Sequence, residues 1–139
     1  MRRSTFDANF HSLDEIREFV AEAARQADFS EKEIYSIQLA ADEASTNIIE
    51  HAYAGIDDGK IEIDCRFEAD ELKIVMRDNG KSFDPSSVPE PNIEADLSER
   101  KIGGLGMYLM RKLMDEVHYE SLPGTGNSLT MIKRRGVAG

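Results

Sequence analysis

The stretch DEASTNIIEHAY, Asp42 to Tyr53, combines the spacing of an amphipathic helix with a polar pair beside its apolar side. Apolar residues that recur every three or four positions predict the buried stripe of this helix. They are Ile34, Ile37, Ala41, Ala44 and Ile48. Glu43 and Asn47 stand four residues apart, so they project from one face next to that stripe. Such a pair is commonplace on a solvated helix, but a carboxylate and an amide beside a core also suit a polar site.

The composition limits what that site can bind. The chain has 139 residues, 40% of them hydrophobic, which suits one domain with a single core. Its 27 acidic and 17 basic residues give a formal net charge of −10. A field of that sign repels phosphates and anionic lipid, so we expect no direct nucleic-acid binding and no membrane partner. A nucleotide still fits if backbone donors, basic side chains or a metal offset the charge locally.

Cysteine content and the chain start indicate the compartment. The single cysteine, Cys65, excludes an internal disulfide framework and a cysteine-based zinc site. The start, MRRSTFDANF, has two arginines with no apolar segment behind them, and no run approaches membrane-spanning length. We therefore expect a soluble cytoplasmic protein.

Two helices and a strand are predicted in the first third of the chain. Residues 4–10 can form a short strand. The pattern Ser12 to Glu15 reads as a capping box that opens a first helix, with Ile16, Phe19, Val20 and Ala23 as its buried stripe. A second capping box, Ser30 to Glu33, opens a longer helix that runs to about Tyr53.

The rest of the chain predicts hairpins and one more helix. Apolar and polar residues alternate with period two, then return to helical spacing, then alternate again. The predicted elements are strands at 61–68 and 72–76, a helix at 105–116, and strands at 117–122 and 128–133. This order indicates an α+β fold, a two-layer sandwich of a mixed, mostly antiparallel sheet with helices on one face.

The segment from Asn79 to Gly104 follows neither period. It holds three of the four prolines, Pro85, Pro89 and Pro91. A long structureless segment inside a compact domain usually marks a functional lid or disorder. We therefore predict one domain over 1–139 with a lid at about 79–104.

Three motifs depart from plain packing, and each also has an ordinary explanation. The first is Glu43-x-x-x-Asn47, which suits a solvated helix equally well. The second is Arg77-Asp-Asn-Gly80, where a predicted strand ends in Asp-x-Gly; a simple turn accounts for it. The third is Gly103-Gly-Leu-Gly106, which enters a predicted helix. Glycines there can be loop hinges, or they can leave backbone N–H groups free for a phosphate.

Taken in order, these motifs are more specific. A helix with E-x-x-x-N, a strand ending D-x-G, and a lid closing on G-x-G before a helix resemble the GHKL superfamily, whose nucleotide site is the Bergerat fold of histidine-kinase-like ATPase domains. The short single-domain form, with DEASTNIIEHAY, DNGKSFDP and KIGGLGMYLMRKLMDEV, is similar to the anti-sigma factor serine/threonine protein kinases. The resemblance covers roughly Leu13 to Arg134.

The resemblance implies roles for the residues of the helix and the first hairpin. Asn47 would ligate Mg²⁺ through its amide oxygen, a hard ligand for a hard cation. Asp78 would accept a hydrogen bond from the adenine amino group of ATP. Gly80 would let the base approach the backbone. Glu43 would orient, and deprotonate, the attacking hydroxyl.

It also implies ATP-binding residues around the lid. Gly104 and Gly106 would present N–H groups to the phosphates, together with Leu105 and Met107 of the same segment. Arg100 and Lys101 are the candidate lid cations. Asn127 would support Asp78, although many superfamily members have threonine at this position.

By the same resemblance, we expect an ATP-dependent anti-sigma factor serine protein kinase. It would sequester a sigma factor, phosphorylate an STAS-domain anti-anti-sigma factor and act as a homodimer, with ATP and Mg²⁺ as cofactors. Two alternatives stay open: a nucleotide-dependent binding module that switches partners without significant kinase activity, and an activator of a phosphatase. Asp78 and the glycines suit all of these, whereas Glu43 favours catalysis.

Overall fold

The computed structural model describes residues 2–56, 58–81, 102–122 and 126–136. Within them the chain forms five strands, three α-helices and two short helical turns. In chain order they are β1 (Arg2–Asp7), η1 (Phe10–Ser12), α1 (Leu13–Gln26), α2 (Glu31–Asn47), η2 (Ile48–Ala52), β2 (Lys60–Glu68), β3 (Glu71–Asp78), α3 (Ile102–Leu113), β4 (Glu116–Leu122) and β5 (Gly126–Arg134).

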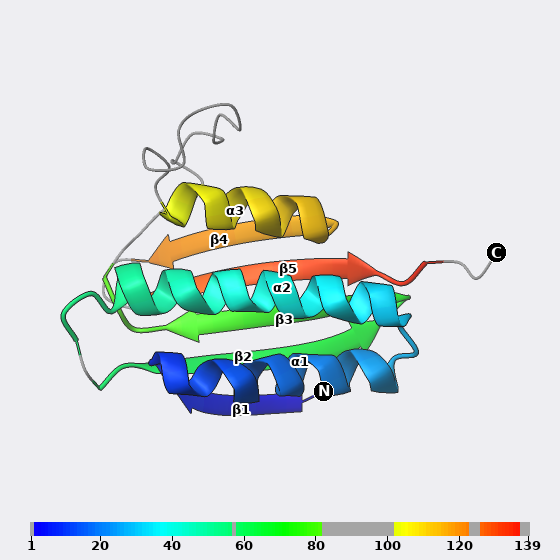
Figure 1. Ribbon diagram of the computed structural model, residues 1–139, viewed down its shortest axis with the longest axis horizontal. Coiled ribbons are helices and arrows are strands. Elements are labelled where there is room, and N and C mark those ends of the chain that lie inside the picture. Colours follow the sequence, from blue (N-terminus) through cyan, green and yellow to red (C-terminus); the bar gives the residue numbers. More distant parts are fainter. Residues whose placement is uncertain (1, 57, 82–101, 123–125, 137–139) are drawn as a thin grey trace.

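The five strands form one sheet in the order β1-β2-β3-β5-β4. Each neighbouring pair is antiparallel. The three α-helices lie over the same face of this sheet (Figure 1). The predicted α+β sandwich is confirmed. The sheet was predicted as mixed, but all pairings between the described strands are antiparallel. No helix in the described ranges is long and apolar enough to cross a membrane.

The two predicted capping boxes had different outcomes. At the start of α2, Ser30 is extended (φ −69°, ψ 162°), its Oγ accepts from Glu33 N at 3.1 Å, and Glu33 Oε1 accepts from Ser30 N at 2.9 Å. Ser12 forms no such box, because η1 already holds it in a helical conformation (φ −84°, ψ −10°). An N-cap needs extended backbone to turn its side chain onto the first turn. The Ser12 prediction was therefore wrong.

The bounds of β1 and of the third helix also differ from those predicted. β1 spans Arg2–Asp7 rather than 4–10, because the chain enters η1 at Phe10. The third helix was predicted at 105–116, but α3 runs from Ile102 to Leu113. Its last turn is closed by the bond from Met114 N to Met110 O at 2.9 Å. The next N–H, that of Asp115, already bonds to Ile132 O in the sheet at 2.9 Å.

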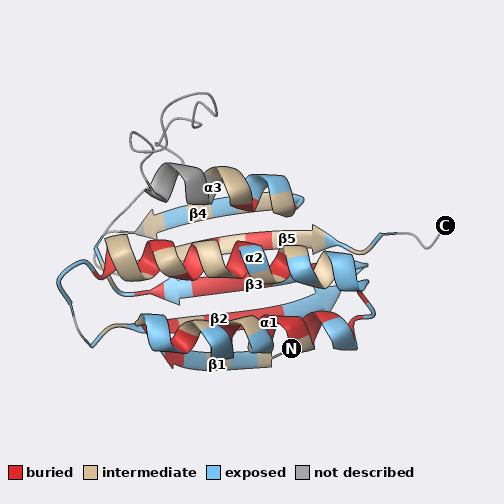
Figure 2. Ribbon diagram, in the orientation of Figure 1, coloured by how far each residue is buried: buried red, intermediate tan, exposed pale blue. Residues whose placement is uncertain are grey.

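The core lies between the helices and one face of the sheet, and Figure 2 shows buried residues along α2, β2 and β3. The stripe predicted for α2 is buried except Ile34, which packs at its edge. Phe19 of α1 is partly buried and meets Phe6 of β1 edge to face at 5.6 Å. This packing fixes the rotation of α2, and with it the direction in which its polar pair points.

The opposite face of the sheet carries a buried carboxylate. Asp64 of β2 is 7% exposed and is held by Arg3 of β1 and Arg77 of β3. The hydrogen bond from Arg3 is the main cause that lowers the pKa of the Asp64 carboxyl; burial opposes this and Arg77 adds to it. Asp64 alternates along β2 with the buried Ile63 and Cys65, so it faces away from the core, and the two arginines cover it there.

We expect Asp64→Asn to lower the free energy of unfolding by about 1–2 kcal/mol at neutral pH, because two charge-assisted bonds weaken while both arginines stay partly solvated. The lowered folded-state pKa stabilises the protein above the unfolded-state value of about 3.9, and this contribution is lost as the pH falls through the folded value. Urea unfolding at pH 7 and pH 3 checks both points. The exposed Asp58→Asn is the control. Equal stability of wild type and Asp64→Asn at pH 7 would contradict the expectation.

Candidate functional site

Asn47, the last residue of α2, is buried without a full set of partners. It is 5% exposed, and its amide Nδ2 has no hydrogen-bond partner among the described residues. A buried polar group left unsatisfied costs about 1–3 kcal/mol, so such groups in native structures call for an explanation. The two ends of an amide are assigned from their surroundings, so the atom left over can serve as oxygen or nitrogen. Asn47 thus keeps bonding capacity for a ligand.

The helix continues past Asn47 as a π-turn, η2, which ends at Ala52. The bond from Tyr53 N to Ile48 O, at 3.0 Å, closes it. The helix therefore reaches about Tyr53, as predicted. Single π-turns within α-helices occur frequently at functional sites.

Gly80 lies where the chain leaving β3 meets the end of η2. A Cβ at Gly80 would lie 2.3 Å from Ala52 O, and the next N–H, that of Lys81, donates to the same oxygen at 2.7 Å. Only glycine allows this approach of two backbones. The sequence argument gave Gly80 a different purpose, the approach of a base. The structure shows that Gly80 lets the chain after β3 pack against the end of η2.

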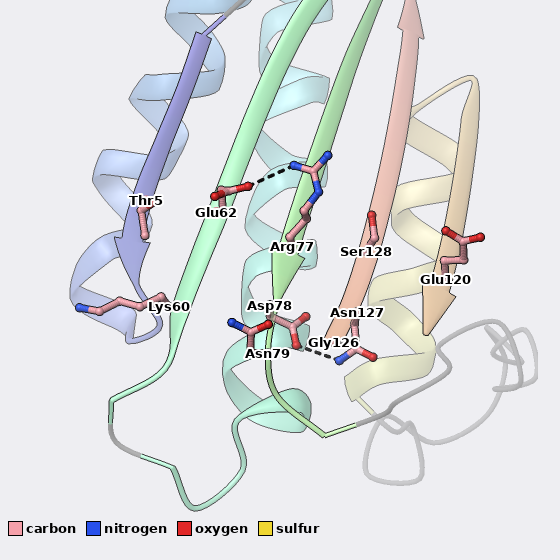
Figure 3. A pocket seen from close by; sticks show the side chains of 10 residues that line it. All are labelled: Thr5, Lys60, Glu62, Arg77, Asp78, Asn79, Glu120, Gly126, Asn127 and Ser128. Carbon is pink, nitrogen blue, oxygen red and sulfur yellow. Dashed lines mark hydrogen bonds and ion pairs between the residues drawn. The ribbon is translucent and has the colours of Figure 1, made fainter. Parts of the chain in front are cut away.

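Asp78 ends β3 and is 6% exposed. Its Oδ1 accepts from Asn127 Nδ2 at 2.8 Å and from Gly80 N at 2.9 Å; neither bond uses Oδ2. Burial raises the pKa of the Asp78 carboxyl, and the two hydrogen bonds act in the opposite direction. Figure 3 shows Asp78 and Asn127 facing each other at the ends of β3 and β5.

Asn127 does more than support Asp78. Its Nδ2 also donates to Lys81 O at 2.9 Å, and its Oδ1 accepts from Ser121 Oγ of β4 at 2.7 Å. The amide therefore connects β5, β4, Asp78 and the chain after β3. A threonine hydroxyl has one donor and could not make both of the Asn127 donations. The contact to Asp78 expected from the sequence is present.

A narrow slot joins these groups on the helical side of the sheet. It is lined by Ala44, Asn47, Ile48, Ala52, Asp78, Met110, Tyr119 and Leu129. Most of this lining is apolar, with Asn47 and Asp78 as its buried amide and carboxylate. Its volume of about 20 Å³ holds a water-sized group, so a purine requires it to widen. Met110 of α3 is unbranched and can change rotamer at low cost.

A larger hollow, of about 460 Å³, lies on the opposite face of the sheet (Figure 3). Its lining is Thr5, Lys60, Glu62, Arg77, Asp78, Asn79, Glu120, Gly126, Asn127 and Ser128. Charged side chains of both signs line it, and Arg77 pairs with Glu62 across it at 3.3 Å. It reaches neither Asn47 nor Glu43. We therefore place the candidate site in the smaller slot, which joins Asn47 to Asp78.

Glu43 lies one helical turn before Asn47 and is partly exposed. Burial is the main cause that raises the pKa of its carboxyl, and the neighbouring carboxylates of Asp42 and Glu50 raise it further. Asp42 itself forms an ion pair with Arg17 of α1 at 2.8 Å. A carboxylate with a raised pKa is a better proton acceptor than an ordinary one, which suits a general base.

The fold and these contacts agree with the comparison to known families. The family described as "Histidine kinase-like ATPase domain" matches residues 6–133. The chain belongs to this family. Among solved structures, the RsbU and RsbW domains of a Mycobacterium tuberculosis protein superpose with a TM-score of 0.66 at 19% identity, covering 97% of this chain and 33% of that one. At that identity the likeness shows the shared fold.

Two curated relatives are closer in sequence. The serine-protein kinase RsbW of Listeria monocytogenes serotype 4a (strain HCC23) is 37% identical over 98 residues, which are 68% of this chain and 62% of the relative. The RsbW of Bacillus licheniformis (strain ATCC 14580) is 38% identical over 131 residues, 86% of this chain and 78% of the relative. This histidine kinase-like ATPase domain thus spans about 62% of the length of the Listeria protein.

The structure describes only some of the predicted lid residues of this ATPase domain. Arg100 and Lys101 lie outside the described residues, as does most of the segment predicted as a lid. Gly104, Leu105, Gly106 and Met107 are in α3, with only the backbone described. Since α3 begins at Ile102, Gly104 falls in the first turn, where N–H groups lack partners within the helix. Gly106 is the fifth residue of α3, after the first four N–H groups that lack such partners.

Several contributors were missed from the sequence. Met110 was predicted only as part of a helix, and Tyr119 and Leu129 only as parts of strands; all three line the slot. Periodicity could have shown that Met110 lies on the inner side of α3, and that Tyr119 and Leu129 lie on the side of their strands that faces the helices. Their meeting beside Asp78 could not, because it depends on the pairing β3-β5-β4.

Proposed function

We propose that this chain is an ATP-dependent anti-sigma factor serine protein kinase. It phosphorylates an STAS-domain anti-anti-sigma factor on serine and controls a sigma factor by partner switching, as a cytoplasmic homodimer. The observation that carries the proposal is the apolar slot with the unsatisfied amide of Asn47 and the carboxylate of Asp78 in its lining. The RsbW relatives, named as serine-protein kinases, support it.

The residues of the slot fit an adenine base. Apolar side chains can cover its flat faces, and Asp78 can accept from the exocyclic amino group while Oδ1 stays bonded to Asn127 and Gly80. Guanine carries a carbonyl oxygen at that position, which would face a carboxylate oxygen. Two acceptors facing each other leave a buried group unpaired, so the slot should prefer adenine.

The residues also fit Mg²⁺ bound mainly through phosphates. The described residues contain no group of three or more His, Cys, Asp or Glu side chains that could hold a metal. Mg²⁺ usually keeps several waters and takes few protein ligands in nucleotide sites. One amide oxygen from Asn47 is consistent with that demand. Bound there, the ion would neutralise charge on the phosphates. The N–H groups at the start of α3, with Arg100 and Lys101, would bind them directly.

In this proposal Glu43 is the general base. Phosphoryl transfer passes through a loose transition state, so the protein contributes alignment and charge neutralisation more than covalent chemistry. Glu43 would accept the proton of the serine hydroxyl as that oxygen bonds to the γ-phosphorus and ADP leaves. Its place one turn from Asn47 puts proton acceptor and metal ligand on the same side of α2.

The test uses the purified chain, γ-labelled ATP, Mg²⁺ and the STAS-domain protein that co-purifies with it from its native cytosol. We expect label on one serine of that partner and none when the serine is replaced by alanine. Binding of ATP and partner without any transfer of label would replace the kinase by a nucleotide-dependent switch module.

The recognition of adenine by Asp78 gives a separate prediction. Wild type should bind ATP at least about tenfold more tightly than GTP. Asp78→Asn should weaken ATP binding by about 10–100-fold and narrow the ATP/GTP difference, since an amide can present a donor to the amino group. Calorimetry with both nucleotides is the measurement, with the exposed Asp58→Asn as control. Equal affinity of wild type for ATP and GTP would remove Asp78 from this role.

A further inference from the structure

Tyr53 ties together three segments around the slot. It directly follows η2 and is 5% exposed. Its hydroxyl donates to Lys60 O at 2.6 Å and accepts from Asn79 N at 2.8 Å. One oxygen thus connects the end of the long helix, the first residue of β2 and the residue after β3.

The Tyr53 ring has little freedom to move. A Cβ at Gly59 would lie 2.6 Å from ring atoms Cγ and Cδ1, so the ring packs directly against the glycine backbone. The Tyr53 N–H closes the π-turn through Ile48 O at 3.0 Å. Backbone and ring are both fixed, which makes the hydroxyl a fixed point for the chain that it contacts.

The segments that Tyr53 connects carry the two polar groups of the site, Asn47 and Asp78. Asn47 immediately precedes η2, and Asp78 immediately precedes Asn79. The bond to Asn79 N holds the peptide that joins Asp78 to Asn79. Gly80 and Lys81 then contact Ala52 of the same turn. Tyr53 is therefore placed to set how Asp78 lies relative to Asn47.

We propose that Tyr53 is a positioning residue for nucleotide recognition. Through its hydrogen bond from the N–H of Asn79, it fixes the position of the Asp78 carboxylate relative to the Asn47 amide. The inference rests on the proposed function, in which these two groups bind the base and the metal. A tyrosine that served packing alone would need its ring and one partner for its hydroxyl. The second bond, to the residue after Asp78, is the one that matters for recognition.

The test is Tyr53→Phe, which keeps the ring and removes both hydroxyl bonds. We expect ATP to bind about tenfold more weakly and the preference for ATP over GTP to narrow, since Asp78 is less well oriented. In the Asp78→Asn background the same change should alter ATP affinity by less than about twofold, because residues that act through one another are not additive. Tyr35→Phe, at a residue 63% exposed on α2, is the matched control and should change nothing.

The outcomes distinguish a failure of this inference from a failure of the proposed function. If wild type shows no preference for ATP, the proposed function fails first. If wild type prefers ATP and Tyr53→Phe lowers only the melting temperature, leaving affinity and preference unchanged, Tyr53 is structural and the inference is overturned. Should Tyr53→Phe fail to fold, Gly59→Ala is the second variant, because it displaces the ring while keeping the hydroxyl. An unchanged ATP preference in folded Gly59→Ala overturns the inference equally.

Discussion

Glu43→Ala should slow phosphoryl transfer to the partner by about 10²–10⁴-fold, the usual contribution of a positioned acid–base group. The loose transition state favours the lower end of this range. ATP affinity should change by less than about twofold, because the Glu43 side chain does not line the slot. The effect should therefore fall on the transfer step and leave nucleotide binding almost intact.

The pH dependence gives a second measure of the same role. Burial and the carboxylates of Asp42 and Glu50 raise the Glu43 pKa, and only the ionised form accepts a proton. Transfer by wild type should rise as the pH rises through this raised pKa and fall below it, and Glu43→Ala should lose that dependence. The measurement is single-turnover transfer of γ-label against pH. Glu15→Ala, exposed on α1, is the control. Transfer by Glu43→Ala at the wild-type rate would show that the base is another group.

Asn47→Ala should remove Mg-dependent nucleotide binding and transfer together. Loss of groups that only support metal ligands already costs about 10–100-fold in affinity, so loss of the proposed ligand should cost at least as much. In EDTA, wild type and variant should bind ATP about equally. Calorimetry with and without Mg²⁺ makes the comparison, and Thr46→Ala on the same helical turn is the control.

The unliganded stability of Asn47→Ala distinguishes a ligand from a structural amide. The amide Nδ2 is buried and unsatisfied, so its removal relieves a cost, although it leaves a small cavity. The melting temperature without nucleotide should therefore stay level or rise while Mg-ATP binding is lost. A variant that is clearly less stable without ligand, and that binds ATP alike with and without Mg²⁺, would assign Asn47 to packing.

The helices and strands could be predicted because each is governed by local pattern. The capping box at Ser30 and the alternation along β2 depend on residues within a few positions. Ser12 has the same local pattern as Ser30, yet the chain before it turns as η1 and removes the cap. A pattern of four residues carries no information about the backbone that precedes it.

The site could be predicted only as separate parts. The spacing of Glu43 and Asn47 follows from the helical period, and Asp78 follows from a strand that ends in Asp-x-Gly. The hydrogen bond from Asn127 to Asp78 depends on the pairing of β3 with β5 and on its register. The approach of Gly80 to Ala52 depends on where η2 ends above the sheet. Such contacts come from tertiary packing, which no short window of sequence contains.

The composition of the slot lining couples nucleotide binding to folding. Ala44 and Asn47 come from α2, Ile48 and Ala52 from η2, and the other four residues from β3, α3, β4 and β5. A partly unfolded chain that lacks any one of these elements has no complete slot, so ligand should bind only the fully folded state. A ligand of this kind adds about 2.7 kcal/mol to the free energy of unfolding at 100 times its Kd. The cellular supply of nucleotide would then add to the stability of the folded protein and lengthen its lifetime against proteolysis.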